Sequence, residues 1–151
     1  MPNPNHKRRK QLTQTLTQLE RQEWGPAQSS SSLTVSCHQL RHKPLGQMTV
    51  EDLRILIGQD IGLPYLMPLA LDTLQNDPLA KGQHYPGDLL CAVLRASSAF
   101  YQKYPAYRLA VRELAALACH AVQWLEEWEQ SSTQKVLNEA LRAFDASGQA
   151  I

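Results

Sequence analysis

The feature that most constrains the fold of this chain is the segment of residues 63–74, in which nearly every side chain is apolar. A helix that is apolar on all sides has to be surrounded by other helices. We therefore expect a central core helix here. Pro64 suits the first turn of that helix, whereas Pro68 removes a backbone hydrogen bond and predicts a kink or a two-step start.

Apolar side chains at helical spacing predict further helices on both sides of this segment. These helices are expected over residues 7–23, 32–42, 49–58, 89–96, 98–104, 106–128 and 131–144. No segment shows the sustained alternation of apolar and polar residues that is typical of strands. The sequence therefore predicts an all-α fold, a compact single-domain bundle of about six to eight helices.

Charge divides the chain, whose 151 residues suit a single domain, into two parts. Four basic residues at positions 7–10 precede the first acidic residue, Glu20, and without them the chain has 11 basic and 14 acidic side chains, a net charge of −3. We predict a basic N-terminal arm or helix over residues 1–18 and a single α-helical domain over residues 19–151. We interpret the arm as a disordered, solubilising segment, which could also touch phosphates without specificity.

Neither a membrane segment nor a metal site is indicated by the sequence. No run approaches 18 apolar residues and the N-terminus lacks the apolar centre of a secretory signal, so we expect a cytoplasmic protein with no membrane partner. Cys37, Cys91 and Cys119 are widely spaced and form no CxxC pair, which predicts buried thiols. No cofactor is expected.

Catalysis and sequence-specific nucleic-acid binding are also disfavoured. The chain has no GxSxG, HExxH, Walker or GxGxxG motif, and its five histidines form no ligand pattern. His84 and Asp88 could form an acid–base pair, but a loop histidine beside a helix cap is the favoured interpretation. LPYLMPLAL carries none of the side chains that read base edges, which excludes it as a recognition helix. We predict that the protein is not an enzyme.

Four sequence blocks around the core segment carry a resemblance to a known family. They are LERQEWGP (19–26), SLTVSCHQLRHKPL (32–45), TVEDLRILIGQ (49–59) and YPGDLL (85–90). Together they resemble the small immunity proteins of bacterial contact-dependent growth inhibition systems. The resemblance covers residues 19–94. The chain departs from the family at Gln83, where members often have an acid, and in a longer part after Tyr104.

The resemblance implies a cytoplasmic protein that binds the toxic C-terminal domain of a delivered exoprotein, often a nuclease, and neutralises it. A nuclease binds its substrate through a positive cleft, so its inhibitor gains from negative charge in complementary positions. The residues that we expect to bind the toxin are the carboxylates of Glu51, Asp60, Asp72, Asp77, Asp88, Glu126, Glu127 and Glu129 and the ring of Tyr85. Asp60 comes first, because it lies on a turn between two glycines and is hard to bury.

Several of these residues also have ordinary structural interpretations. Asp88 suits an N-cap, and Glu51 and Asp72 suit solvated helix faces. The glutamates around Trp128 are expected at the C-terminal end of a long helix, where carboxylates oppose the helix dipole. For Trp24 and Tyr65, packing in the core is the favoured interpretation over contact with a partner.

The sequence thus predicts a monomeric inhibitor that binds one toxin domain, with a basic nuclease as the expected partner. It would act by covering the active site or the nucleic-acid channel of the toxin. The alternative that stays open is a helical protein-interaction adaptor, or a non-specific nucleic-acid-associated protein that uses the basic N-terminal arm.

Overall fold

The computed structural model describes residues 4–28 and 30–149. Over these residues the chain forms nine α-helices and two short 3-10 helices, and no strand. The α-helices are α1 (Pro4–Leu12), α2 (Leu16–Glu20), α3 (Ser32–Leu40), α4 (Val50–Gly58), α5 (Leu63–Asn76), α6 (Asp88–Leu94), α7 (Ser98–Lys103), α8 (Pro105–Ala121) and α9 (Glu127–Gln149), and the 3-10 helices are η1 (Leu45–Gln47) and η2 (Val122–Trp124). The predicted all-α fold is confirmed.

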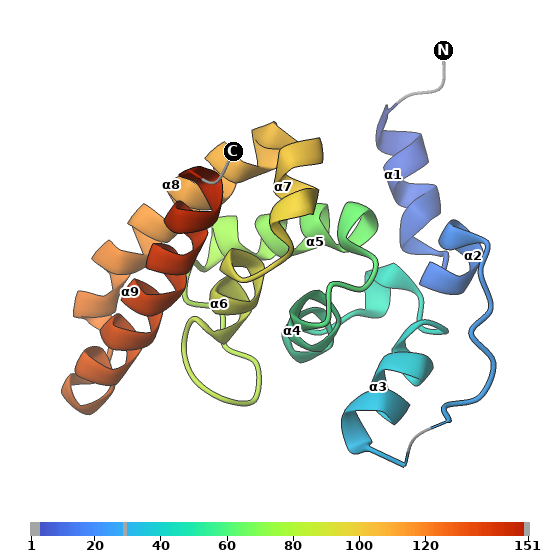
Figure 1. Ribbon diagram of the computed structural model, residues 1–151, viewed down its shortest axis with the longest axis horizontal. Coiled ribbons are helices and arrows are strands. Elements are labelled where there is room, and N and C mark those ends of the chain that lie inside the picture. The colour runs from blue at the N-terminus through green and yellow to red at the C-terminus, as the bar shows by residue number, and fades with distance from the viewer. Residues whose placement is uncertain (1–3, 29, 150–151) are drawn as a thin grey trace.

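The helices are arranged around α4, α5 and α6. Figure 1 shows α8 and α9 running side by side at one end of the molecule and α1, α2 and α3 at the other. α4 packs against α3, α5 and α6, and α6 packs in turn against α8 and α9. The buried residues of all these elements form one cluster, so a single core joins both ends.

α5 is the central helix that the apolar segment predicts. Its buried residues are Leu63, Leu66, Met67, Ala70, Leu71 and Leu74. The helix is continuous through Pro68, so the predicted two-step start is wrong. It begins after Gly62, whose φ of +65° lies in the left-handed region that favours glycine.

The N-terminal part differs from the predicted single helix over residues 7–23. The chain breaks after α1, and Thr15 starts α2 with a capping box in which its hydroxyl accepts the N–H of Gln18. Leu16 then lies fully buried in the core. α1 itself is helical from Pro4, and Arg8 makes an ion pair with Asp72 of α5. The interpretation of the arm as disordered is therefore wrong for residues 4–12.

The C-terminal part also divides earlier than predicted. α8 ends at Ala121 instead of continuing to residue 128, and α9 starts at Glu127 instead of Ser131 or Ser132. The reason is the turn between them, where the side-chain amide of Gln130 donates to the carbonyl oxygen of Leu125 at 2.9 Å. Because the chain reverses here, Trp128 leaves the apolar face that it was expected to join.

Two of the three cysteine predictions agree with the structure. Cys37 and Cys91 are buried, and Cys119 is only half-buried. Burial raises the pKa of the thiols of Cys37 and Cys91. Over the described residues, none of the helices combines the length and the apolar character needed to span a bilayer.

Candidate partner-binding surface

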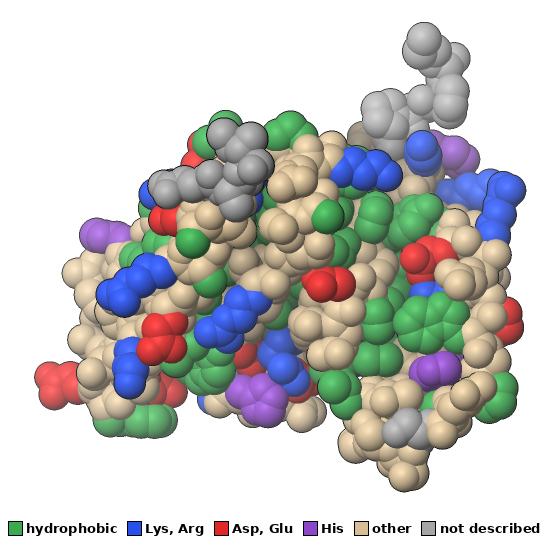
Figure 2. Space-filling view, in the orientation of Figure 1, with side chains coloured by type: hydrophobic (Ala, Val, Ile, Leu, Met, Phe, Trp, Pro, Cys, Tyr) green, Lys and Arg blue, Asp and Glu red, His purple; other side chains and the backbone are tan. Residues whose placement is uncertain are grey.

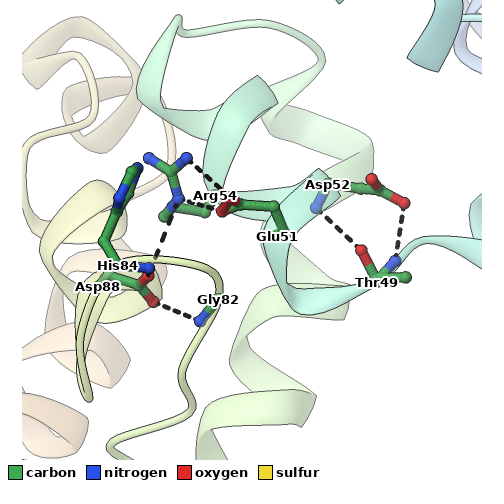
Figure 3. A network of polar contacts seen from close by, with 7 residues as sticks. All are labelled: Thr49, Glu51, Asp52, Arg54, Gly82, His84 and Asp88. Atoms are coloured by element: carbon green, nitrogen blue, oxygen red, sulfur yellow. Dashed lines mark hydrogen bonds and ion pairs between the residues drawn. The ribbon is translucent and has the colours of Figure 1, made fainter. Parts of the chain in front are cut away.

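Two of the four sequence blocks that carry the resemblance, TVEDLRILIGQ and YPGDLL, meet in space, because α4 packs directly on α6. Arg54 of α4 joins them. Its guanidinium binds Glu51 one turn earlier, with Nη2 at 3.0 Å from Oε2, and its Nε lies 3.9 Å from Oδ2 of Asp88. Figure 3 shows these side chains between α4 and the loop of residues 81–87, which we call the α6 loop.

Asp88 holds the α6 loop in its conformation. Its side chain is only 2% exposed. Oδ1 accepts the backbone N–H of Gly82 at 2.7 Å, and Oδ2 accepts that of His84 at 3.1 Å. The N-cap of α6 is Gly87, with a φ of +89°, so the prediction that Asp88 caps this helix is wrong. Because Asp88 is the first helical residue, its carboxylate turns back to the loop.

Gly82 allows the α6 loop to lie against both carboxylates. A Cβ atom at this position would lie 2.8 Å from Oε1 of Glu51 and 3.1 Å from Oδ2 of Asp88. A larger residue would therefore have to displace these carboxylates or the loop itself. The loop depends on contacts that come from both blocks.

The carboxylates at the start of α4 are tied down as well. Asp52 forms a capping box with Thr49 and an ion pair with Lys43, whose Nζ lies 2.6 Å from Oδ2. Burial acts to raise the pKa of Asp52, but the hydrogen bonds from Lys43 and Thr49 outweigh it and lower that pKa. The hydrogen bond from Arg54 lowers the pKa of Glu51. Glu51 is 13% exposed, so its interpretation as a solvated helix face is wrong.

Next to this network lies a surface pocket of about 260 Å³ between α4, the α6 loop and α6. Arg54 and Arg95 contribute to its walls together with His84 and the carboxylate of Asp88. Tyr85 also lines it and is half-buried. Burial, followed by the neighbouring Cys91, raises the pKa of Tyr85 to about 12, and its hydroxyl therefore stays protonated at neutral pH.

Three further predicted residues lie apart from the network. Asp60 is exposed, as expected, with a φ of +57°, and it accepts the backbone N–H of Ser97 at 2.9 Å. Asp77 is exposed at the C-terminal end of α5, where it accepts the N–H of Leu79 at 3.1 Å. Asp72 is half-buried and paired with Arg8, so it is not freely solvated.

The three glutamates near Trp128 lie at the connection between α8 and α9. Glu126 and Glu127 are exposed and Glu129 is half-buried. Glu127 and Glu129 belong to the first turn of α9, so their predicted place at a helix C-terminus is wrong. Carboxylates in a first turn are stabilised by the helix dipole instead of opposing it.

Arg54 and Gly82 are two residues of the network that the sequence did not indicate, and Trp24 does not lie in the core as the sequence predicts. Arg54 is the only Lys or Arg between residues 49 and 71 and follows Glu51 by three positions, a spacing that could have revealed the pair. Trp24 is 38% exposed and does not belong to the core. Its ring stacks on the guanidinium of Arg41, which is buried and paired with Glu20.

The polar groups of the α6 loop do not form an acid–base pair. His84 binds Asp88 through its backbone N–H and not through its ring. Within residues 4–28 and 30–149, no group of three His, Cys, Asp or Glu side chains is placed to hold a metal ion. The network of Arg54, Glu51 and Asp88 fixes the shape of the α6 loop.

Comparison with protein families gives a match. The family model of the CDI immunity proteins matches residues 18–111, which run from the end of α2 to the first turns of α8 and include both blocks of the network. No curated protein and no solved structure matches the chain. Since the match covers more than half of the sequence, this chain belongs to the CDI (contact-dependent growth inhibition) immunity proteins, a family whose function is to neutralise a toxin.

Proposed function

We propose that this protein binds, one to one, the C-terminal toxin domain of a contact-dependent growth inhibition exoprotein in the cytoplasm. The proposed toxin is a nuclease. The immunity protein neutralises it by covering its active site or its nucleic-acid channel. It contributes no chemistry of its own.

The observation that carries this proposal is the network between α4 and the α6 loop. Its charged groups are engaged with one another or with backbone N–H groups, as in the pairs of Arg54 with Glu51 and of Lys43 with Asp52. Such a network fixes a surface before a partner arrives. A preformed surface loses less conformational entropy on binding, which favours a tight complex.

The proposed contact surface consists of the α6 loop together with two exposed carboxylates of the matched region, Asp60 and Asp77. Asp60 and Asp77 are exposed and accept only backbone N–H groups in the described contacts, so they offer negative charge to a basic partner. Tyr85 offers an aromatic ring beside the pocket. Glu51 and Asp88 support the loop from beneath, and Asp72 is partly neutralised by Arg8.

The test is a calorimetric titration with the C-terminal domain of the exoprotein encoded with this protein, together with an assay of its nuclease activity. We expect tight one-to-one binding and loss of activity. A labelled RNA or DNA should no longer bind the toxin in the complex if the immunity protein covers its channel. Failure to bind, or binding that leaves the toxin fully active, would contradict the proposal.

Charge reversal tests the proposed surface. Asp60→Lys combined with Asp77→Lys should slow association, most strongly at low salt, because these charges steer the encounter. Glu139→Lys reverses an exposed carboxylate on α9 and serves as the control. Equal association rates for the double variant and this control would exclude Asp60 and Asp77 from the interface.

A further inference from the structure

Two tryptophans on the connection between α8 and α9 lie almost entirely in solvent. Trp124 is 80% exposed and Trp128 is 79% exposed. Both lie outside residues 18–111, the part that matches the family. Large aromatic side chains exposed together are typical of surfaces that bind a partner.

α8 carries two further exposed apolar side chains. Leu109 and Leu117 are 64% and 56% exposed, and their separation of eight residues places them on one broad side of the helix. Trp124 follows on η2, just beyond the end of α8. We call Leu109, Leu117, Trp124 and Trp128 the α8–α9 surface.

The turn that carries the tryptophans is held by hydrogen bonds. The Gln130 amide donates to the carbonyl oxygens of Leu125 at 2.9 Å and Gln123 at 3.4 Å. The backbone N–H of Glu129 donates to the carbonyl oxygen of Glu126 at 2.8 Å. The two indole rings therefore project from a defined turn, which is the arrangement that makes an aromatic residue an effective anchor.

The charge around the turn that carries the tryptophans is negative. Residues 113–134 contain four glutamates and no lysine or arginine, and the nearest arginines of α8, Arg108 and Arg112, flank Leu109 instead. Glu126 and Glu127 lie between the two tryptophans in the chain and are exposed. Along α9, by contrast, the face in Figure 2 shows basic and acidic side chains interleaved. The tryptophan end of the α8–α9 surface thus combines exposed indole rings with exposed carboxylates that make no ion pair in the described contacts.

This charge selects among the possible occupants. A second copy of the chain, docked through the same face, would bring the two sets of glutamates together, and like charges at an interface are unfavourable. An anionic membrane surface would be repelled in the same way. A protein partner with apolar and basic side chains could cover the apolar face and pair with the carboxylates.

We infer that the α8–α9 surface is a second contact for the toxin domain, with Trp124 and Trp128 as anchors and Glu126 and Glu127 facing basic side chains of the toxin. This inference rests on the proposed function. It assigns recognition to a part of the chain beyond the region that matches the family, in addition to the α6 loop.

The experiment is a calorimetric and kinetic titration of the toxin domain with the double variant Trp124→Ala, Trp128→Ala. We expect its affinity to fall by at least about 30-fold, the loss typical of one interface hot spot. Glu126→Gln with Glu127→Gln should slow association and reduce its salt dependence. Leu33→Ala, which removes an exposed apolar side chain from α3, is the matched control and should bind like the wild type.

The outcomes separate the inference from the proposed function. If the wild type binds the toxin domain and the tryptophan variant binds equally well, the inference is overturned and the proposed function stands. If the wild type does not bind, both are overturned. A wild-type dimer in sedimentation that the tryptophan variant abolishes would assign the surface to a second copy. The unfolding midpoint of the variant checks that the fold is intact.

Discussion

The carboxylate of Asp88 and the backbone N–H of Gly82 are joined by a 2.7 Å hydrogen bond, so the first residue of α6 holds the loop that precedes it. Asp88→Asn keeps the shape of the side chain but removes its charge and one acceptor. We expect a loss of about 1–3 kcal/mol in the free energy of unfolding, because one of the two backbone N–H groups that the buried carboxylate accepts loses its partner. Urea denaturation measures this loss.

The control for that variant is Asp77→Asn. Asp77 also accepts a backbone N–H but is exposed, so water can replace it. Its change should stay within about 0.5 kcal/mol. Equal losses for the two variants would contradict the structural role of Asp88.

The start of α4 predicts an acid-sensitive stability. The pKa values of Glu51 and Asp52 are lowered from their ordinary values of 4.5 and 3.8. Stability from these pairs is therefore fully present above those ordinary values and is lost as pH falls below them. Unfolding midpoints measured from pH 6 down to about pH 3 should decrease steeply at the acid end.

Glu51→Gln isolates the contribution of the pair with Arg54. It should lower stability at neutral pH and make the acid limb of the curve shallower. An unchanged slope in this variant would mean that Glu51 does not contribute to the acid sensitivity.

Substitution by alanine should affect stability in opposite ways at Gly62 and Gly58. The φ of Gly62 is +65°, and a Cβ atom there would lie 2.7 Å from Cδ2 of Leu16. Gly62→Ala should therefore destabilise the protein by about 1–3 kcal/mol. Gly58, by contrast, lies in α4 with no atom within 4 Å of an added Cβ. Gly58→Ala should be neutral or stabilising by up to about 1 kcal/mol. Thermal unfolding of both variants decides the point.

The basic residues of α1 predict weak binding to nucleic acid that is independent of toxin binding. Lys7, Arg8, Arg9 and Lys10 are exposed, and only Arg8 has a described ion pair within the fold. Deletion of residues 1–10 should abolish any weak, salt-sensitive binding to RNA or DNA, because such binding depends on phosphate contacts. Toxin binding should persist.

The matched variant for that deletion is Lys7→Glu with Arg9→Glu, which keeps the chain length. Fluorescence anisotropy with labelled RNA measures nucleic-acid binding, and calorimetric titration with the toxin domain measures toxin binding. Loss of toxin binding in both variants would mean that α1 belongs to the toxin interface.

Much of the fold could be predicted because the amphipathic pattern determines where helices run. The segment of residues 63–74 is the clearest case, since a helix with so many apolar side chains has only one stable place, the core. α3, α4 and α7 also begin within one or two residues of their predicted starts. In these segments local pattern and tertiary packing agree.

The sequence was less informative where tertiary contacts decide. Leu12, Leu16 and Leu19 are spaced as on a single helix, but the chain breaks between α1 and α2, and of the three only Leu16 and Leu19 of α2 belong to or pack against the described core cluster. Asp88 matches the pattern of an N-cap, yet its position depends on Gly82 and Arg54, and the latter lies 34 residues earlier in the chain. No local pattern contains that information.

The residues predicted to bind the toxin include both exposed and buried carboxylates, because burial depends on tertiary contacts. An exposed carboxylate such as Asp60 and a buried one such as Asp88 look alike in a sequence, and only their neighbours distinguish them. Trp128 shows the opposite case. An apolar residue at helical spacing is normally assigned to the core, and the turn held by Gln130 turns it outward.

α9 limits how this protein can be combined with parts of related proteins. Its buried side chains Leu137, Ala140 and Phe144 complete the core, although they lie beyond the region matched to the family. A hybrid that joins the matched region to another C-terminal part would have to restore these contacts. An exchange limited to residues 123–132 would replace the outward-facing turn and keep the buried Val122 and Thr133, so partner preference could be transplanted while these interior side chains are left in place.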